Sequence, residues 1–196
     1  MDYSTEINGH TLEFFAEEHA YLIDGIQVPS ITQILAHRFG GKYSHVKREV
    51  LQRAADKGTA VHDAIYEFCT FGKDSDLPEV RNFNFLQRKF GFTVLEGETP
   101  VILSWHDEPI AAGRLDLVIR MGDKVGGADI KRTSTLDKNY LAAQLNLYRI
   151  AYRQSYGIEW EFLRGIHLRE NVRKFVEIPI NENIACELVN DFLGGN

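Results

Sequence analysis

The sequence predicts a single mixed α/β domain. The first observation behind this prediction is the order of the patterns along the chain: helices, a meander of three strands, a helix, a hairpin and a final helix. The second is the length of 196 residues, which suits one domain. The third is that the sequence has no internal repeats, low-complexity tracts or linker-like segments.

The N-terminal elements are predicted from turn and cap residues. Residues 11–28 contain apolar runs on either side of Asp24 and Gly25, a dipeptide typical of tight turns, so they predict a β-hairpin. Ser30 is of a type that caps helices, and it predicts a short helix over 31–39 that the two following glycines end.

The remaining elements are predicted from hydrophobic periodicity. Helices are expected over 43–70, with a break near Gly58 left open, and over 79–90, 137–156 and about 181–193; strands are expected over 92–105, 110–120, 124–132, 161–169 and 172–180. Turns are expected over 107–109 and at Gly122 and Asp123.

Composition narrows the functional classes only partly. Hydrophobic residues make up 44% of the chain and charged residues 26%, which is ordinary for a protein with a buried core. The net charge of −6 argues against a general polyanion binder, but a nuclease needs only a local basic stripe. We expect a cytoplasmic protein, because we find no secretion signal and no apolar run of the roughly 20 residues that cross a bilayer. Cys69 and Cys186 are read as free thiols, with a disulfide as the alternative.

Two acids and a lysine on neighbouring strands are the first candidates for chemistry. Asp129 and Lys131 are two residues apart and so share a face of one strand, and a short hairpin brings Asp116 close to Asp129. Adjacent carboxylates repel each other unless a cation lies between them, and Mg²⁺ or Mn²⁺ suits such oxygen ligands. A bound metal would lower the pKa of a water, and Lys131 would orient that water or stabilise charge in the transition state. The alternative is a surface-facing strand with a Lys–Asp pair, although Asp and Lys are depleted in strands.

Helical residues form the second group of candidates. Gln144 is a polar residue in the apolar stripe of the predicted helix 137–156, and Tyr148 follows one turn later. Gln144 either satisfies a hydrogen bond of the core or, with Tyr148, contacts a ligand. Arg132, Lys138 and Arg149 flank the same end of the fold and could supply a basic stripe for substrate.

A histidine on the first long helix has two readings. His62 belongs to one helical face that also contains Ala55, Thr59, Ile65, Tyr66 and Cys69. On such a face a lone histidine is more often a satisfied core residue than a ligand.

The series GRLDLVI, ADIKRT and QLNLY resembles the motifs of the PD-(D/E)XK nuclease superfamily. More narrowly, it is similar to the RecB-type branch, which includes phage exonucleases and the mitochondrial genome maintenance exonuclease. The resemblance covers about residues 55–156. It implies a restriction-endonuclease-like core with a mixed central β-sheet flanked by helices, in a single nuclease domain over 1–196. The motif-bearing core would span about 55–180, and residues 1–42 with the N-terminal hairpin would be a decoration.

The resemblance also implies roles for individual residues. Asp116 and Asp129 would be metal ligands, Lys131 the catalytic lysine, and the Ile130 carbonyl a backbone ligand. The segment GTAVH places His62 at the position of a metal-binding histidine.

Further positions follow from the same resemblance. Gln144 and Tyr148 match its Q-x-x-x-Y helix and would contact substrate or brace the lysine. Glu98 is the best match for an additional acid, with Glu96 nearby.

The function expected from these residues is Mg²⁺- or Mn²⁺-dependent DNA hydrolysis at strand ends, in a phage or prophage recombination or repair setting. The alternatives are a non-catalytic nucleic-acid-binding module on the same fold and a small-molecule metal-dependent phosphohydrolase. Exonuclease or endonuclease action, strand preference and oligomeric state stay open, including a homo-oligomer or a phage recombination partner.

Overall fold

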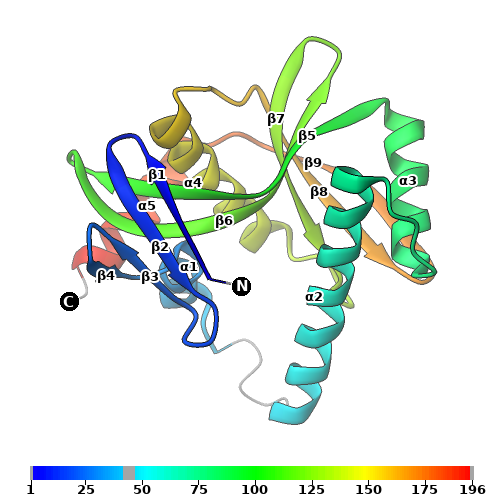
Figure 1. Cartoon of the computed structure of the whole chain (residues 1–196), viewed down its shortest axis with the longest axis horizontal. Helices are drawn as coiled ribbons and strands as arrows, with labels where there is room; N and C mark the ends of the chain where they lie inside the picture. The colour runs from blue at the N-terminus through cyan, green and yellow to red at the C-terminus, as the bar shows by residue number, and fades with distance from the viewer. Residues whose placement is uncertain (1, 42–46, 195–196) are drawn as a thin grey trace.

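Two β-sheets and five helices make up residues 2–41 and 47–194, the part of the chain that the computed structural model describes (Figure 1). The first sheet contains β1 (Tyr3–Ile7), β2 (His10–Phe15), β3 (Ala20–Ile23) and β4 (Ile26–Val28). The second contains β5 (Phe92–Trp105), β6 (Glu108–Met121), β7 (Lys124–Lys131), β8 (Phe162–Arg169) and β9 (Val172–Ile178). The helices are α1 (Ile31–Phe39), α2 (Arg48–Phe71), α3 (Pro78–Phe90), α4 (Lys138–Tyr156) and α5 (Glu182–Gly194). The predicted α/β fold class is confirmed.

The predicted N-terminal hairpin is part of a larger antiparallel sheet with strand order β1-β2-β3-β4. Asp24 and Gly25 turn between β3 and β4 with φ of 52° and 79°, the positive values that a two-residue hairpin turn requires. Leu12 and Phe14 are buried in a cluster that includes Ile102 of β5, so this small sheet packs against the second sheet.

Helix α1 begins where the sequence predicts. Ser30 and Gln33 form a reciprocal capping box, in which each side chain accepts a hydrogen bond from the other residue's backbone N–H. The backbone N–H of Ala112 donates to Pro29 O at 3.1 Å, so the start of α1 is fixed beside β6.

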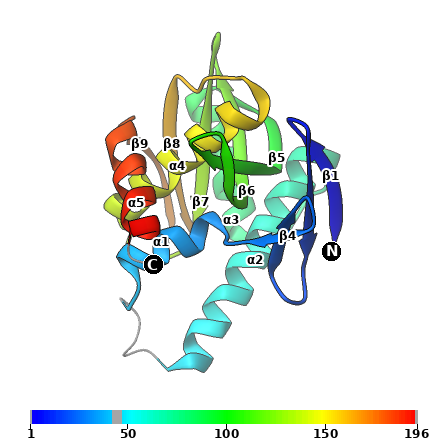
Figure 2. The same ribbon diagram turned by 90° about the vertical axis from the view of Figure 1, so that its left-hand side faces the viewer.

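The second sheet has strand order β5-β6-β7-β8-β9, and among its neighbouring pairs only β7 and β8 are parallel. Helix α4 makes the crossover between these two strands, as a parallel pair requires. One buried cluster joins the sheet to α1, α4 and α5, and a second joins it to α2 and α3, so helices cover both faces (Figure 2). The predicted mixed sheet flanked by helices is therefore present.

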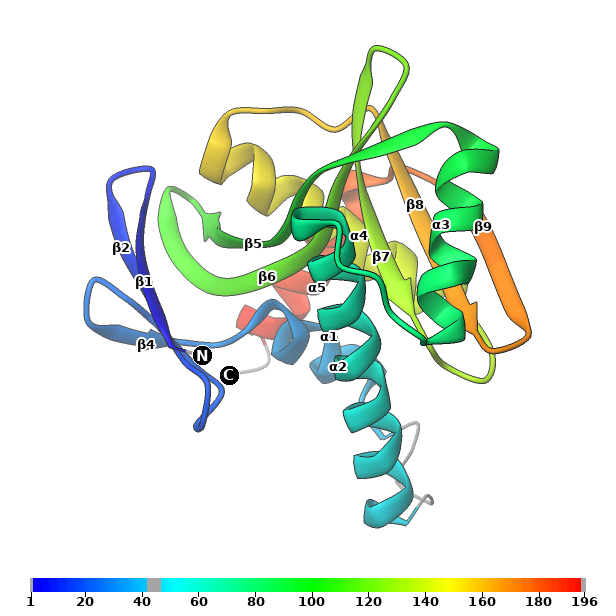
Figure 3. The same cartoon turned by 45° about the vertical axis from the view of Figure 1, so that its right-hand side comes forward.

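Helix α2 settles the open question of a break at Gly58 and differs from its prediction in which residues it buries. It runs without a break through Gly58, and its periodicity does not describe one packed face, since Ala55 and Thr59 are exposed. Burial begins at Val61, and the N-terminal half of α2 extends away from the body of the protein (Figure 3). The predicted helix start at residue 43 lies outside the described residues.

Two glycines, one in the sheet and one in helix α2, give matched tests of how tightly each element is packed. A Cβ added at Gly127 would overlap the ring of Trp160, whereas one added at Gly58 would meet no atom within 4 Å. We expect Gly127→Ala to lower the free energy of unfolding by about 1–3 kcal/mol through overpacking. Gly58→Ala should raise it by about 0.5–1 kcal/mol, because alanine loses less backbone entropy in a helix. Urea denaturation of both variants measures these changes, and equal stability of the two would contradict the packing described here.

Candidate metal centre

The candidate site lies where β6 and β7 separate. Their antiparallel pairing runs from Met121 opposite Lys124 to Leu117 opposite Ala128 and is not continued beyond that pair. The Oδ2 atom of Asp116 accepts a hydrogen bond from the backbone N–H of Ile130 at 2.7 Å. Beyond the last backbone pair, the Asp116 side chain accepts the hydrogen bond that a backbone carbonyl would otherwise accept. This bond holds the Asp116 carboxylate between the two strands.

Asp129 and Lys131 form a buried ion pair on the next strand. Asp129 is 3% exposed, and Nζ of Lys131 lies 2.9 Å from its Oδ1 and 2.8 Å from its Oδ2. Ala128 and Ile130 pack into the cluster with α2 and α3, so the predicted alternation of faces along β7 is confirmed. Asp129 therefore holds the ammonium of Lys131 in place, two residues along the same strand.

His62 reaches the same place from the packed half of α2. Its Nε2 donates to the carbonyl oxygen of Ile130 at 3.1 Å, and its Nδ1 lies 3.5 Å from Oδ1 of Asp116. His62 is thus not a histidine satisfied within the apolar core of α2. It lies in a polar cluster with an acid and a backbone carbonyl, both of which can accept from an imidazolium or share a cation with an imidazole.

Glu98 completes a group of three acceptors. One ligand atom from each of His62, Glu98 and Asp116 lies within 4.8 Å of the others. Glu98 has a φ of 53° in the middle of β5, and its Oε2 pairs with Nε of Arg114 at 2.7 Å. Glu96, the alternative acid, is not in this group and accepts a hydrogen bond from the Tyr152 hydroxyl at 2.8 Å.

The electrostatics of the cluster are dominated by burial and by the opposed charges. Burial lowers the pKa of His62, but the charge of Asp116 and its hydrogen bond outweigh burial and raise that pKa to about 9. Burial raises the pKa of Asp129 to about 6, although Lys131 opposes this shift. The pKa of Asp116 is lowered, because His62 and Lys131 outweigh its burial.

These donors fit a divalent cation. Carboxylates and a backbone carbonyl are the hard oxygen ligands that Mg²⁺ and Mn²⁺ take, and an imidazole is a common ligand of transition metals. A cation held by His62, Glu98 and Asp116 would also offset the repulsion between these acids and the buried Asp129. The Ile130 carbonyl and Asp129 are the additional ligands that the sequence resemblance implies.

Gln144 and Tyr148 lie on the face of α4 that packs on the sheet. Both side chains are 6% exposed, and Oε1 of Gln144 has no hydrogen-bond partner among the described residues. Tyr148 packs on Gly113, where an added Cβ would lie 3.1 Å from its hydroxyl. Its pKa is raised well above the usual value, by burial first and then by the charge of Asp116. The glycine of the GRLD motif therefore leaves room for the Tyr148 ring beside the cluster.

Arg132 and Arg149, two residues of the predicted basic stripe, form ion pairs with acids of other elements. Nε of Arg132 pairs with the buried Glu79 of α3 at 2.7 Å. Arg149 pairs with Glu159 and Glu182, because it lies about 100° around α4 from Tyr148.

Lys138 is exposed at the first position of α4. The substrate-binding role of Arg132, Lys138 and Arg149 stays a prediction, and the guanidinium groups of Arg132 and Arg149 also connect structural elements.

Three residues that the sequence reasoning passed over lie near the site. Arg114 pairs with Glu98, and its separation of two residues from Asp116 on β6 was the signal that it shares a face with that acid. Nζ of Lys131 lies 6.0 Å from the ring centre of Tyr140. His167 is paired with Lys131 across β7 and β8, and its Nε2 donates to Thr133 O at 2.7 Å.

Comparison with known proteins gives little further information. The chain matches no protein-family model and no curated protein. It is similar to the crystal structure of SSO0001, with 15% identity and a TM-score of 0.48 over 86% of this chain and 76% of that one. Among the described residues, we find no helix with the length and apolar character needed to cross a membrane.

Proton release provides a test of the metal centre. His62 carries a proton below its pKa of about 9, and a metal ion can take an imidazole nitrogen only after that proton leaves. We expect the affinity for Mn²⁺ to rise about tenfold per pH unit between pH 6 and 8, because one proton is released. Below pH 6 the affinity should fall further, since Asp129 with its pKa of about 6 also becomes protonated.

Isothermal titration calorimetry at pH 7, in two buffers of different ionisation enthalpy, measures the protons released. His62→Gln should abolish both the release and most of the binding. His37→Gln, at an exposed position of α1, should retain both. An affinity for Mn²⁺ that does not change with pH would contradict the assignment of His62 as a ligand.

Proposed function

We propose that this chain is a Mg²⁺- or Mn²⁺-dependent deoxyribonuclease that hydrolyses DNA phosphodiester bonds at strand ends. The observation that supports this most strongly is the meeting of three acids, an imidazole and an ammonium at the separation of β6 and β7. These groups come from α2, β5, β6 and β7, so elements distant in sequence converge on one small volume. Their residue types are those of metal-assisted phosphodiester hydrolysis.

The proposed mechanism gives each residue one task. His62, Glu98 and Asp116 would hold the metal ion, together with Asp129 and the Ile130 carbonyl. When bound, the metal would polarise a phosphoryl oxygen and lower the pKa of a water. Lys131 is held by Asp129 with its ammonium beside the cluster, where it would donate a hydrogen bond to the attacking water or to the phosphate. Water would attack phosphorus and release a proton to solvent. The bond to the leaving oxygen would break, and that oxygen would take up a proton from solvent.

DNA as the substrate, action at strand ends and a phage or prophage setting rest on the motif resemblance. The negative net charge favours one rival, a phosphohydrolase of small molecules, because such an enzyme needs no basic groove. The other rival is a nucleic-acid-binding module without turnover. One experiment separates the three.

We expect Asp129→Asn to reduce Mn²⁺-dependent cleavage of end-labelled DNA at least about 100-fold, the size of effect seen when one preorganised electrostatic group is removed. Asp123→Asn is the matched control, because Asp123 is an exposed acid in the turn after β6. The rates are measured on DNA and on bis(4-nitrophenyl) phosphate, a diester without a polymer.

Each outcome decides between the functions. Metal-dependent cleavage of DNA that is lost only in Asp129→Asn supports the nuclease. Binding of DNA without turnover by the unmodified protein would indicate the binding module. Cleavage of the small diester without preference for DNA would indicate the small-molecule enzyme. Full activity of Asp129→Asn would exclude the proposed site.

A further inference from the structure

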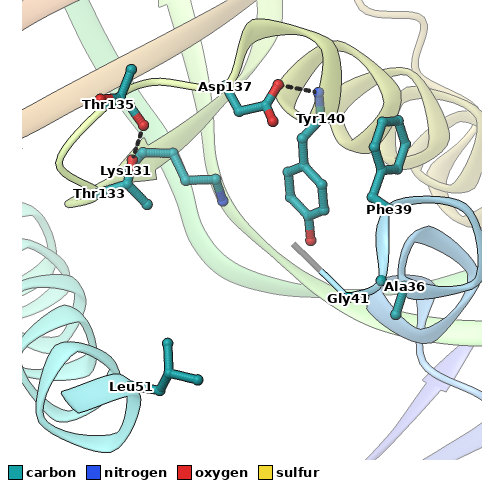
Figure 4. Close-up of a pocket in the computed structure, with 10 residues that line it drawn as sticks. Ala36, Phe39, Gly41, Leu51, Lys131, Thr133, Thr135, Asp137 and Tyr140 are labelled. Atoms are coloured by element: carbon teal, nitrogen blue, oxygen red, sulfur yellow. Dashed lines mark hydrogen bonds between the residues drawn. The ribbon is translucent and has the colours of Figure 1, made fainter. Parts of the chain in front are cut away.

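A pocket of about 660 Å³ adjoins the candidate metal centre (Figure 4). Its walls come from the end of α1, from α2, from the residues after β7 and from the first turn of α4. This volume lies within the range of about 300–1,000 Å³ found for small-molecule sites. The pocket is therefore large enough for a planar group of the size of a nucleobase.

Lys131 belongs to both the pocket and the metal centre. Its ammonium is 2.8 Å from Asp129 in the cluster, and the same side chain projects into the pocket (Figure 4). A phosphate bound beside Lys131 therefore has the pocket next to it. A nucleotide joined to that phosphate would have its base within reach of the pocket, because base and phosphate are separated only by one sugar.

Aromatic and aliphatic side chains form the apolar walls. The rings of Phe39 and Tyr140 are 5.5 Å apart in an edge-to-face arrangement, and both are half-buried. Leu51 of α2 and Ala36 of α1 line the pocket from other sides (Figure 4). Aromatic faces of this kind stack on bases without regard to sequence, since every base has a π face.

The polar rim is supplied by the connection between β7 and α4. The hydroxyl of Thr133 donates to Thr135 O at 2.9 Å, and the carboxylate of Asp137 accepts from the backbone N–H of Tyr140 at 3.1 Å. His167 fixes the same connection through Thr133 O. This rim places hydroxyl, carbonyl and carboxylate oxygens at one side of the pocket. Such oxygens can accept hydrogen bonds from the amino and imino groups on the edge of a base.

We propose that this pocket holds the base of the nucleotide next to the phosphodiester bond that is cleaved, stacked on Tyr140. The inference rests on the proposed nuclease function and adds a substrate class to it. A base can enter a side pocket only after it leaves its stack, and this is least costly in a single strand. The substrate is therefore single-stranded DNA or the frayed end of a duplex.

Abasic oligonucleotides test the pocket without altering the protein. End-labelled single strands carry one tetrahydrofuran residue, moved one position at a time, and Mn²⁺-dependent cleavage is followed on a sequencing gel. We expect one phosphodiester bond in each strand, at a fixed number of nucleotides from the abasic residue, to be cleaved about tenfold more slowly. At that bond the sugar without a base lies at the pocket. This factor corresponds to the loss of one base–aromatic stack.

A variant cycle then assigns the effect to Tyr140. Tyr140→Ala should cleave the intact strand about tenfold more slowly, and the abasic residue should cause no further loss. Tyr140→Phe retains the ring and should retain the abasic penalty. Phe71→Ala is the control, because Phe71 is an exposed aromatic residue at the end of α2 far from Leu51, and it should retain the full penalty.

The outcomes distinguish failure of the base pocket from failure of the proposed nuclease function. If the unmodified protein cleaves no strand in the presence of Mn²⁺, the nuclease proposal fails and the base pocket fails with it. If it cleaves all strands but shows the same rate at every position of the abasic residue, the nuclease stands and the base pocket is overturned. A penalty that persists in full in Tyr140→Ala, with thermal melting showing that this variant is folded, also overturns the pocket.

Discussion

The separation of β6 from β7 is the constraint on which the site depends. Two strands of a sheet normally satisfy their backbone groups in each other, and a strand that leaves its neighbour exposes donors and acceptors. Here the N–H of Ile130 finds its acceptor in the side chain of Asp116, so the break in pairing is stabilised by the same carboxylate that faces the cluster. The carbonyl of Ile130 is left for His62. The opening in the sheet and the polar site are one feature.

Charge balance explains how so many ionisable groups lie together. Asp116 faces His62, Asp129 faces Lys131 and Glu98 faces Arg114. Each buried acid would otherwise incur a large desolvation cost, and the raised pKa of Asp129 shows that its partner offsets this cost only in part. A divalent cation would bring two charges in exchange for the His62 proton. Metal binding would therefore reduce the repulsion between the acids and displace a single proton.

The sequence predicted what depends on local pattern and missed what depends on distant contacts. The alternation of residues placed Asp129 and Lys131 on one face of a strand. The turn at Asp24, the helix cap at Ser30 and most bounds of the elements were predicted from local patterns. No local pattern showed that Arg132 would meet Glu79, 53 residues earlier, or that Arg149 would meet Glu182, 33 residues later. The sequence therefore carried no sign that these two guanidinium groups also join helices and strands. The motif resemblance favoured Glu98 over Glu96, and Glu98 is the one of the two that lies in the cluster with His62 and Asp116.

The crossover between parallel strands explains why the pocket and the metal centre adjoin. The parallel pairing of β7 and β8 requires a crossover, which α4 provides from Lys138 onward. The connection that leaves the carboxyl end of β7 begins directly after Lys131. In open α/β sheets, ligands bind in the crevice outside the carboxyl ends of such strands. Tyr140 in the first turn of α4 then packs against Phe39 at the end of α1, which closes the pocket. A lysine at the end of β7 thus contacts the acid of its own strand on one side and an aromatic pocket on the other, and the substrate that we propose for both would carry a phosphate joined to a planar group.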